Sequence, residues 1–226
     1  MQLEKITKYR RNDEKRRYDD ACGLAHAMEL LGDRWAMLVM RELAYGPRRF
    51  SELKSDLPGI SANVLTQRLN ELESRGLVRK LKLPPPASVQ VYEATEWGLE
   101  AIPVIASLGK WAARSPLHDP TLPMGHVSLI MSLQTLLSPA LADGLDARIG
   151  FRFGDASYVL TLRHGRLDVE RREVEDCDVT FSGPPNAMAG VIHGGAPPDT
   201  IQIEGDMALA KRFMKLFPLP PKVVTS

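Results

Sequence analysis

The residues best placed to do chemistry are polar side chains on a predicted helix at residues 61–76. Asn63, Thr66 and Gln67 lie opposite a stripe of leucines, and Ser61 is the expected N-cap at the start of the same helix. Asn and Gln can present a donor and an acceptor together to adenine in the major groove, and hydroxyls can contact either strand. These four residues are candidates for contacting DNA bases. The alternative is a helix face that contacts only solvent.

Basic residues lie on both sides of this helix. Arg48, Arg49 and Lys54 lie on or just before the preceding short helix, and Lys80 and Lys82 lie on the following strand. Such side chains supply salt-dependent affinity for phosphates with little sequence preference. Each is therefore a candidate phosphate contact, although an exposed basic residue can also serve only solubility.

Hydrophobic periodicity and breaks at Gly46-Pro47 and Pro58-Gly59 predict the elements that hold these side chains. Four helices should precede a strand pair with a proline-rich connection, which has the place and length of a wing. An amphipathic segment at residues 95–114 follows, and Pro103 should kink or break it. The expected helices and strands are residues 22–31, 35–43, 50–57, 61–76, 77–83 and 89–94.

Several linked motifs within residues 20–112 resemble the HxlR family of bacterial, MarR-like winged-helix regulators. They are Gly-Asp-Arg-Trp at 32–35, GPRRFSEL at 46–53, LTQRL at 65–69 and LESRGLV at 72–78. The resemblance implies a transcriptional regulator, expected to repress, that binds a two-fold related operator as a homodimer held by the first and last helices of this domain. The wing departs from the family pattern, because residues 84–89 lack the usual basic residue. More of the sequence preference should then depend on the helix at 61–76.

Cys22 lies at the expected start of the first helix, where the helix dipole favours a thiolate. Arg16 and Arg17 also favour ionisation, whereas Asp19 and Asp20 oppose it. Some relatives in the resembled family use a cysteine at this position to sense oxidants or electrophiles. Cys22 is thus a possible redox sensor, and an unreactive cysteine is the alternative.

The second half of the chain has the pattern of an α+β domain in which helices pack on an antiparallel sheet. Its predicted helices and strands are residues 126–137, 139–144, 151–162, 167–169, 179–181, 185–193, 201–203 and 207–217. The motifs VTFSG at 179–183 and IQIEGD at 201–206 resemble sterol-carrier-like domains, which implies an apolar tunnel for lipids. The candidate pocket residues are apolar and could equally form an ordinary core: Phe151, Phe153, Met188, Ile192, Leu209, Phe213 and Phe217.

The expected fold is therefore a winged helix-turn-helix DNA-binding domain followed by an α+β sterol-carrier-like domain. Charge is divided between the halves: residues 1–115 have 19 Lys and Arg against 15 Asp and Glu, and residues 116–226 have 10 against 13. A basic excess suits the half that would face phosphates. The expected divisions are a flexible basic arm at 1–19, the DNA-binding and dimerisation domain at 20–114, a linker at 115–124, the sterol-carrier-like domain at 125–218 and a tail at 219–226.

The two cysteines are too few for a disulfide framework. The scattered histidines do not have the spacing of a metal site, a cofactor site or a catalytic group. No apolar run is long enough for a membrane span. We therefore expect a cytoplasmic protein that is not an enzyme, needs no metal or cofactor, and has DNA, a second copy of itself and an apolar effector as partners. A different class of function remains open, namely a lipid carrier that uses the winged helix only to dimerise.

Overall fold

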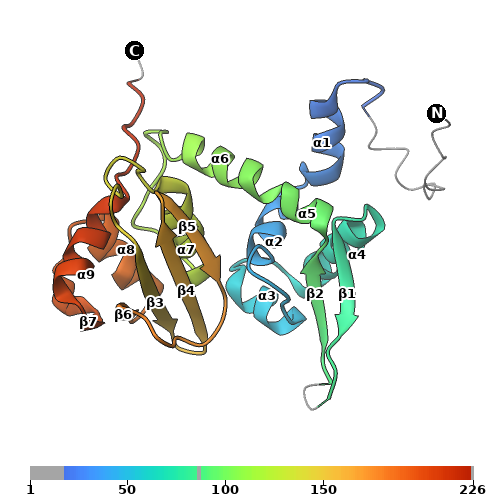
Figure 1. Cartoon of the computed structure of the whole chain (residues 1–226). Helices are drawn as coiled ribbons and strands as arrows, with labels where there is room; N and C mark the ends of the chain where they lie inside the picture. Colours follow the sequence, from blue (N-terminus) through green and yellow to red (C-terminus); the bar gives the residue numbers. More distant parts are fainter. Residues whose placement is uncertain (1–17, 86–87, 225–226) are drawn as a thin grey trace.

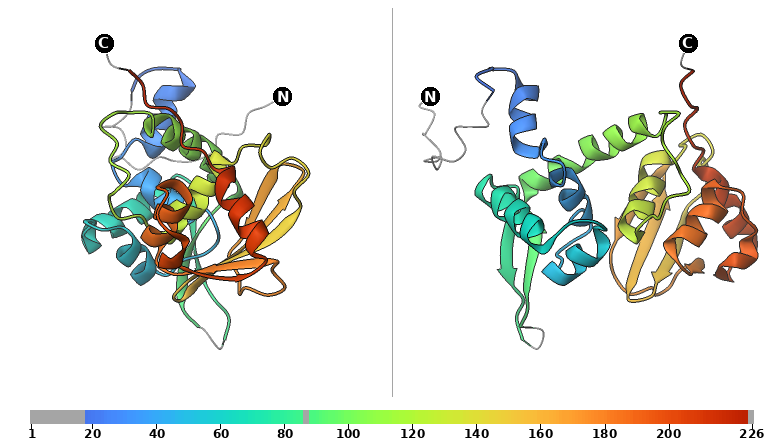
Figure 2. Two further views of the ribbon diagram at one scale, coloured as in Figure 1. Left: turned by 90° about the vertical axis from the view of Figure 1, so that its left-hand side faces the viewer. Right: turned by 180° about the vertical axis from the view of Figure 1, so that it is seen from behind.

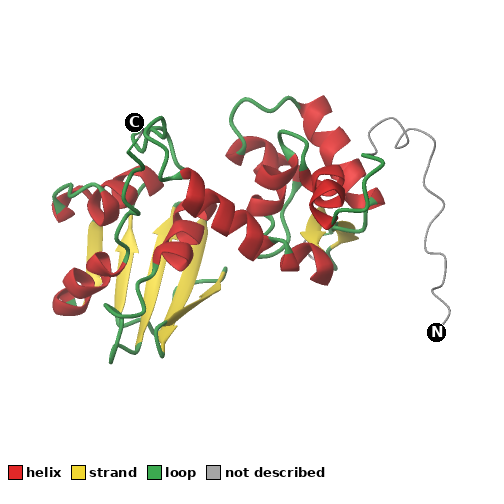
Figure 3. Ribbon diagram, turned by 90° about the horizontal axis from the view of Figure 1, so that it is seen from above, coloured by secondary structure: helices red, strands yellow, loops and turns green. Residues whose placement is uncertain are grey.

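Two separate hydrophobic cores divide the structure, a computed structural model that describes residues 18–85 and 88–224. Figure 1 shows the two domains side by side, with α6 running across the top from one to the other. Figure 3, seen from above, shows the same division. Of the predicted basic arm at 1–19, residues 1–17 lie outside the described residues.

The first domain has the predicted order of helices and strands. Leucines and other apolar side chains recurring every three or four residues form its core, including Leu65, Leu69 and Leu72 of one helix. The predicted break of the segment at 95–114 occurs at Ala101, and Pro103 lies in the first turn of the helix that follows. The elements are α1 (Gly23–Leu31), α2 (Ala36–Glu42), α3 (Phe50–Asp56), α4 (Ala62–Ser74), β1 (Val78–Lys82), β2 (Gln90–Ala94), α5 (Glu96–Glu100) and α6 (Ile102–Ala112).

The wing is a two-stranded antiparallel pair, in which Val78 lies opposite Ala94. Arg48 extends this pair, because its backbone exchanges two 2.8 Å hydrogen bonds with Tyr92. Helix α5 packs against the beginning of β1 so closely that a Cβ on Gly98 would lie 2.1 Å from the carbonyl oxygen of Leu77. The wing is thereby fixed to the helices beside it.

The second domain is a five-stranded sheet in the order β5-β4-β3-β6-β7. Figure 2 shows its helices gathered on one face of the sheet. Stacked aromatic side chains, among them Phe151 and Phe181 with ring centres 5.2 Å apart, fill the space between the two layers. The elements are α7 (His126–Leu136), β3 (Ala147–Phe153), β4 (Ala156–Arg163), β5 (Arg166–Glu170), β6 (Val179–Ser182), α8 (Pro185–His193), η2 (Pro198–Thr200), β7 (Gln202–Gly205), α9 (Met207–Phe213) and η3 (Met214–Leu216).

Four predictions for the second domain were wrong in detail. The predicted segment 151–162 is two antiparallel strands, because the chain turns at Gly154, which has φ of 63°, between β3 and β4. The sheet is mixed, because β3 and β6 are parallel, and alternation of side chains within a strand does not encode the direction of its partner. Residues 139–144 form turns ending at Gly144 with φ of 64° instead of a helix. The terminal helix becomes a 3-10 helix after Phe213, so its last turn is tighter than predicted.

Candidate DNA interface and apolar pocket

Helix α4 is the candidate reading helix. Ser61 caps it, since its hydroxyl accepts a 3.2 Å hydrogen bond from the amide of Val64. The leucines of α4 are buried, and the predicted reading residues Asn63, Thr66 and Gln67 are exposed. The prediction that these three side chains lie on the exposed face of the helix, opposite the leucines, is confirmed.

Two of the exposed side chains are engaged within α4 itself. The hydroxyl of Thr66 donates to the carbonyl of Ala62 at 2.9 Å, and the amide of Gln67 donates to the carboxylate of Glu71 at 2.9 Å. Any contact of Gln67 with a base must therefore replace its bond to Glu71. Such an exchange costs little where both states are fully hydrogen-bonded.

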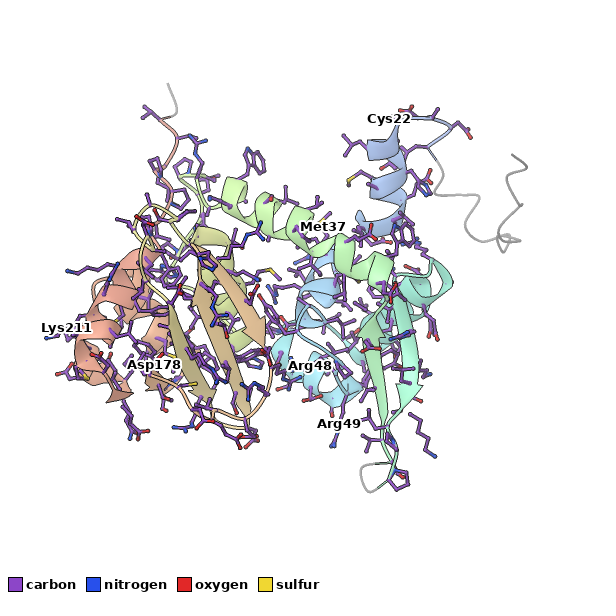
Figure 4. All side chains as sticks on the ribbon, viewed as in Figure 1. Cys22, Met37, Arg48, Arg49, Asp178 and Lys211 are labelled. Carbon is purple, nitrogen blue, oxygen red and sulfur yellow. The ribbon has the colours of Figure 1, made fainter. Side chains whose placement is uncertain are left out.

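The candidate phosphate residues divide into exposed and buried members. Arg49, Lys80 and Lys82 are exposed and Lys54 is half-buried, so solvent reaches all four side chains. The prediction that Arg48 contacts phosphate at the surface was wrong, because the side chain of Arg48 is only 3% exposed. Figure 4 shows Arg48 between the two domains and Arg49 below it, nearer the wing.

Arg48 is buried because it is the centre of an ion cluster. Its guanidinium contacts the carboxylates of Asp56, Glu52 at 3.7 Å and Glu42 at 3.8 Å. Burial raises the pKa of Glu42, although Arg41 and Arg48 oppose that rise. A buried charge needs such partners to offset its desolvation, so Arg48 has a structural role inside the domain.

The ion cluster continues into the second domain through His126. The sequence did not predict this contact between the domains. His126 lies between Asp56, at 3.3 Å, and the hydroxyl of Tyr158, at 2.8 Å. Burial alone would raise the pKa of Asp56, but hydrogen bonds from His126 and Arg48 lower it to about 2. Tyr45 packs edge-on against Tyr158 with ring centres 5.9 Å apart. No local pattern in the sequence signals this contact, because its members are distant along the chain.

Arg68 lies inside the first domain, where it forms ion pairs with Asp33 and Glu71. Since Arg68 follows Gln67 directly, the buried pair also restricts how α4 can rotate in its place.

Helices α1 and α6 expose apolar side chains on the described surface. Those of α1 are Leu24 and Met28, and those of α6 are Val104, Leu108 and Trp111, the last 70% exposed. Neither helix has a fully buried residue. Exposed apolar side chains gathered on a helix are a feature that interaction surfaces often have.

Cys22 is exposed at the N-cap position of α1, far from the second domain (Figure 4). The backbone amides of Ala25 and Leu24 lower the pKa of its thiol. Burial instead raises the pKa of Cys177, the other free cysteine. The predicted neighbours Arg16 and Arg17 lie outside the described residues. Among the described residues, the backbone amides at the start of α1 lower this pKa.

Most of the predicted pocket residues pack in the core of the second domain. Phe151, Phe153, Met188 and Phe213 are buried against one another or against the sheet, and Leu209 packs at the edge of that core. Aromatic side chains thus occupy the space where a tunnel was expected. The sequence could not distinguish a filled core from an open one, because both use the same residues.

A pocket of about 520 Å³ lies beside this core, and Ile192 and Phe217 are the predicted residues that line it. Its inner wall is apolar, whereas Lys211, Lys215 and His193 supply polar groups. Burial lowers the pKa of His193. Lys211 lies on the outer face of the domain, away from the first domain (Figure 4). The full lining is Val191, Ile192, His193, Gly195, Pro198, Lys211, Met214, Lys215, Phe217, Pro218 and Leu219.

Within residues 18–85 and 88–224, no cluster of three or more His, Cys, Asp or Glu is arranged to hold a metal ion. The same residues include no helix with the length and apolar character needed to cross a bilayer.

Two families match the chain in succession. Residues 30–118 match the HxlR-like helix-turn-helix family, and residues 129–218 match the SCP-2 sterol transfer family. The uncharacterized HTH-type transcriptional regulator YvaP of Bacillus subtilis is 36% identical over 86 residues, which are 38% of this chain and 80% of YvaP. The regulator YodB of the same organism is 37% identical over 86 residues, 38% of this chain and 77% of YodB.

The solved structure of YodB from B. subtilis in its reduced form is 33% identical, covers 44% of this chain and 100% of that chain, and has a TM-score of 0.39. The first domain is therefore similar in sequence to HTH-type transcriptional regulators. The second domain is similar to the SCP-2 sterol transfer family. The chain belongs to the HxlR-like helix-turn-helix transcriptional regulators and has a C-terminal domain of the SCP-2 sterol-carrier type.

Proposed function

We propose that the protein is a homodimeric repressor that binds a two-fold related operator and responds to an apolar effector in its second domain. The observation that supports DNA reading most directly is the polar face of α4. Asn63, Thr66 and Gln67 are exposed together, while the opposite face is fixed in the core by buried leucines. A rigid helix with such a face can enter the major groove and contact bases.

Phosphate contacts would come from the accessible basic residues Arg49, Lys54, Lys80 and Lys82. Arg49 is the N-cap of α3, Lys54 lies on α3, and Lys80 and Lys82 lie on β1. These residues therefore come before and after α4 in the chain. Ser61, the fourth base-reading candidate, is the N-cap of α4, and its hydroxyl accepts a hydrogen bond from the amide of Val64. Arg48 is excluded from this set by its burial.

The exposed apolar faces of α1 and α6 support dimerisation through these two helices. Covering Leu108 and Trp111 with a second copy would remove apolar surface from water, which is the main driving force for association. A two-fold dimer places its reading helices on half-sites about 10 base pairs apart, or a multiple of that.

The pocket supports an amphiphilic effector. Its volume of about 520 Å³ lies within the range of ligand sites, which is about 300–1,000 Å³. Val191, Ile192 and Phe217 would contact an apolar chain, and Lys211 and Lys215 would favour an anionic head group. The match to a sterol transfer family also favours a lipid-like ligand.

Footprinting on DNA upstream of its own and neighbouring genes tests the operator. We expect a protected two-fold related site, and Asn63→Ala, Thr66→Ala and Gln67→Ala combined should abolish sequence preference. Ser74→Ala, at the other end of α4, is the matched control and should bind like the parent. If the triple variant keeps the parent's sequence preference, the alternative of a lipid carrier with a dimerising winged helix gains support.

A further inference from the structure

The last described residues bind back onto the end of α6, and we name residues 218–223 the C-terminal strap. Its anchor is Nζ of Lys222, which donates hydrogen bonds to the carbonyl oxygens of Ala113 (3.0 Å), Ser115 (2.9 Å) and His118 (3.2 Å). The last carbonyls of a helix are the negative end of its dipole, so an ammonium group is favourable there. Figure 1 shows the strap passing beside this end of α6.

The backbone of the strap reinforces the anchor. The amide of Val223 donates to the carbonyl of Arg114 at 2.8 Å, and Nε of Arg114 donates to the carbonyl of Pro221 at 3.3 Å. Three of its six residues are prolines, at 218, 220 and 221. Because proline fixes φ, the strap is stiff and transmits a displacement at one end to the other.

The opposite end of the strap is a wall of the pocket. Pro218 and Leu219 line the pocket together with the preceding Phe217, across from Val191 and Ile192 of α8. If the strap left α6, Pro218 and Leu219 would be free to move away and the pocket would lose apolar contacts. A ligand in the pocket therefore binds better when the strap is docked.

We propose that the C-terminal strap couples ligand in this pocket to the end of α6. The inference rests on the proposed effector function. Because the docked strap strengthens ligand binding, linkage requires that bound ligand favours the docked strap by the same factor. Helix α6 also exposes Leu108 and Trp111, the face proposed for dimerisation. Ligand in the second domain thus acts on the helix that positions the two reading helices.

The first test is ligand affinity in the full chain after loss of the anchor. Lys222→Met removes the ammonium but keeps most of the side chain, and its exposed position leaves folding unaffected. We expect a fluorescent fatty acid, 12-NBD-stearate, to bind this variant at least about fivefold more weakly than the parent, the lower end of typical coupling. Arg163→Met, which removes an exposed charge from β4, is the control and should bind like the parent.

The second test is hydrogen exchange of residues 109–118, which include the end of α6. Saturating probe should slow exchange there in the parent and have little effect in Lys222→Met. If the probe binds both proteins equally, the coupling is wrong while the effector site stands. If the parent does not bind the probe, the effector proposal fails, and the coupling fails with it.

Discussion

Nε2 of His126, the first residue of α7, lies 3.3 Å from Oδ2 of Asp56, the last residue of α3. The contact joins the two domains, because α3 precedes the reading helix and α7 belongs to the sterol-carrier-type domain. Nδ1 of the same imidazole lies 2.8 Å from the hydroxyl of Tyr158 on β4. One side chain thus bridges the helix-turn-helix unit and the sheet.

Asp56→Asn should destabilise the protein most at neutral pH and least in acid. The pKa of Asp56 is about 2 in the folded protein and about 3.9 in an unfolded chain. Its stabilisation is therefore fully present above pH 4 and is lost as the pH falls through 2. We expect a loss of about 1–2 kcal/mol at pH 7, since Asp56 is only partly buried and solvent screens it.

Urea denaturation of parent and Asp56→Asn between pH 7 and pH 2.5 measures this difference. Asp168→Asn, which changes an exposed carboxylate of β5, is the control and should leave the unfolding free energy unchanged throughout. A difference between parent and Asp56→Asn that stays constant down to pH 2.5 would show that the ionised carboxylate is not the source of stabilisation.

The neighbours Arg48 and Arg49 should give opposite results. Arg48→Met leaves the buried Glu42 with one fewer partner and should cost about 3–5 kcal/mol of unfolding free energy. Arg49→Met changes an exposed residue and should alter stability by less than about 0.5 kcal/mol. Only Arg49→Met should weaken DNA binding in a folded protein, with a smaller dependence of affinity on salt.

Thermal unfolding and salt-dependent DNA titrations separate the two effects. If Arg49→Met retains the salt slope of the parent, Arg49 does not contact phosphate. An unfolding free energy unchanged by Arg48→Met would mean that the ion cluster contributes nothing to stability.

Most elements of both domains could be predicted, because those elements depend on local patterns. The leucine stripe of α4 and the alternation in β3 and β4 are visible in short windows of sequence. Arg48 could not be placed, because its burial depends on Glu42, Glu52 and Asp56 converging on one point. Nothing in its immediate neighbours distinguishes it from the exposed Arg49.

Partners that are distant in sequence were predicted least well. The parallel pairing of β3 with β6 joins strands separated by a hairpin and a long connection. Likewise, His126 meets Asp56 from 70 residues away, and Lys222 meets Ala113 from 109 residues away. Composition identified apolar pocket candidates, but packing decided which of them, such as Phe151, became core.

The dimer proposal predicts that a charge on α6 separates the subunits. Trp111→Glu would place a carboxylate in the centre of the proposed apolar contact, where its desolvation is costly. Analytical ultracentrifugation should show a dimer for the parent and a monomer for this variant. Leu117→Glu is the matched control, because Leu117 is 92% exposed and lies outside α6. A dimeric Trp111→Glu protein would place the interface elsewhere.

The pocket lysines should select the head group of a ligand. Lys211→Ala combined with Lys215→Ala removes two positive charges from the lining and leaves its apolar wall intact. We expect 12-NBD-stearate to bind about tenfold more weakly, which corresponds to about 1.4 kcal/mol. A neutral probe, NBD-cholesterol, should bind parent and variant alike if it enters the same pocket. Equal loss for both probes would indicate a damaged pocket instead of a lost charge contact.

Cys22 and Cys177 provide a matched pair to test the redox role that the sequence predicted for Cys22. Backbone amides at the start of α1 lower the pKa of Cys22, whereas burial raises that of Cys177. Because the thiolate is the reactive form, iodoacetamide at pH 7 should modify Cys22 faster. Peroxide should then weaken operator binding by the parent and by Cys177→Ser, but not by Cys22→Ser.

The expected mechanism is local, because Cys22 lies at the N-cap of α1, one of the two helices proposed to hold the dimer. Oxidation to a sulfenic acid makes the side chain larger and more polar beside Leu24 and Met28, and it should disturb their packing against a second copy. Sedimentation of peroxide-treated parent should therefore show weaker dimerisation, reversed by dithiothreitol. If Cys22→Ser loses operator affinity in peroxide to the same extent as the parent, Cys22 is not the sensor.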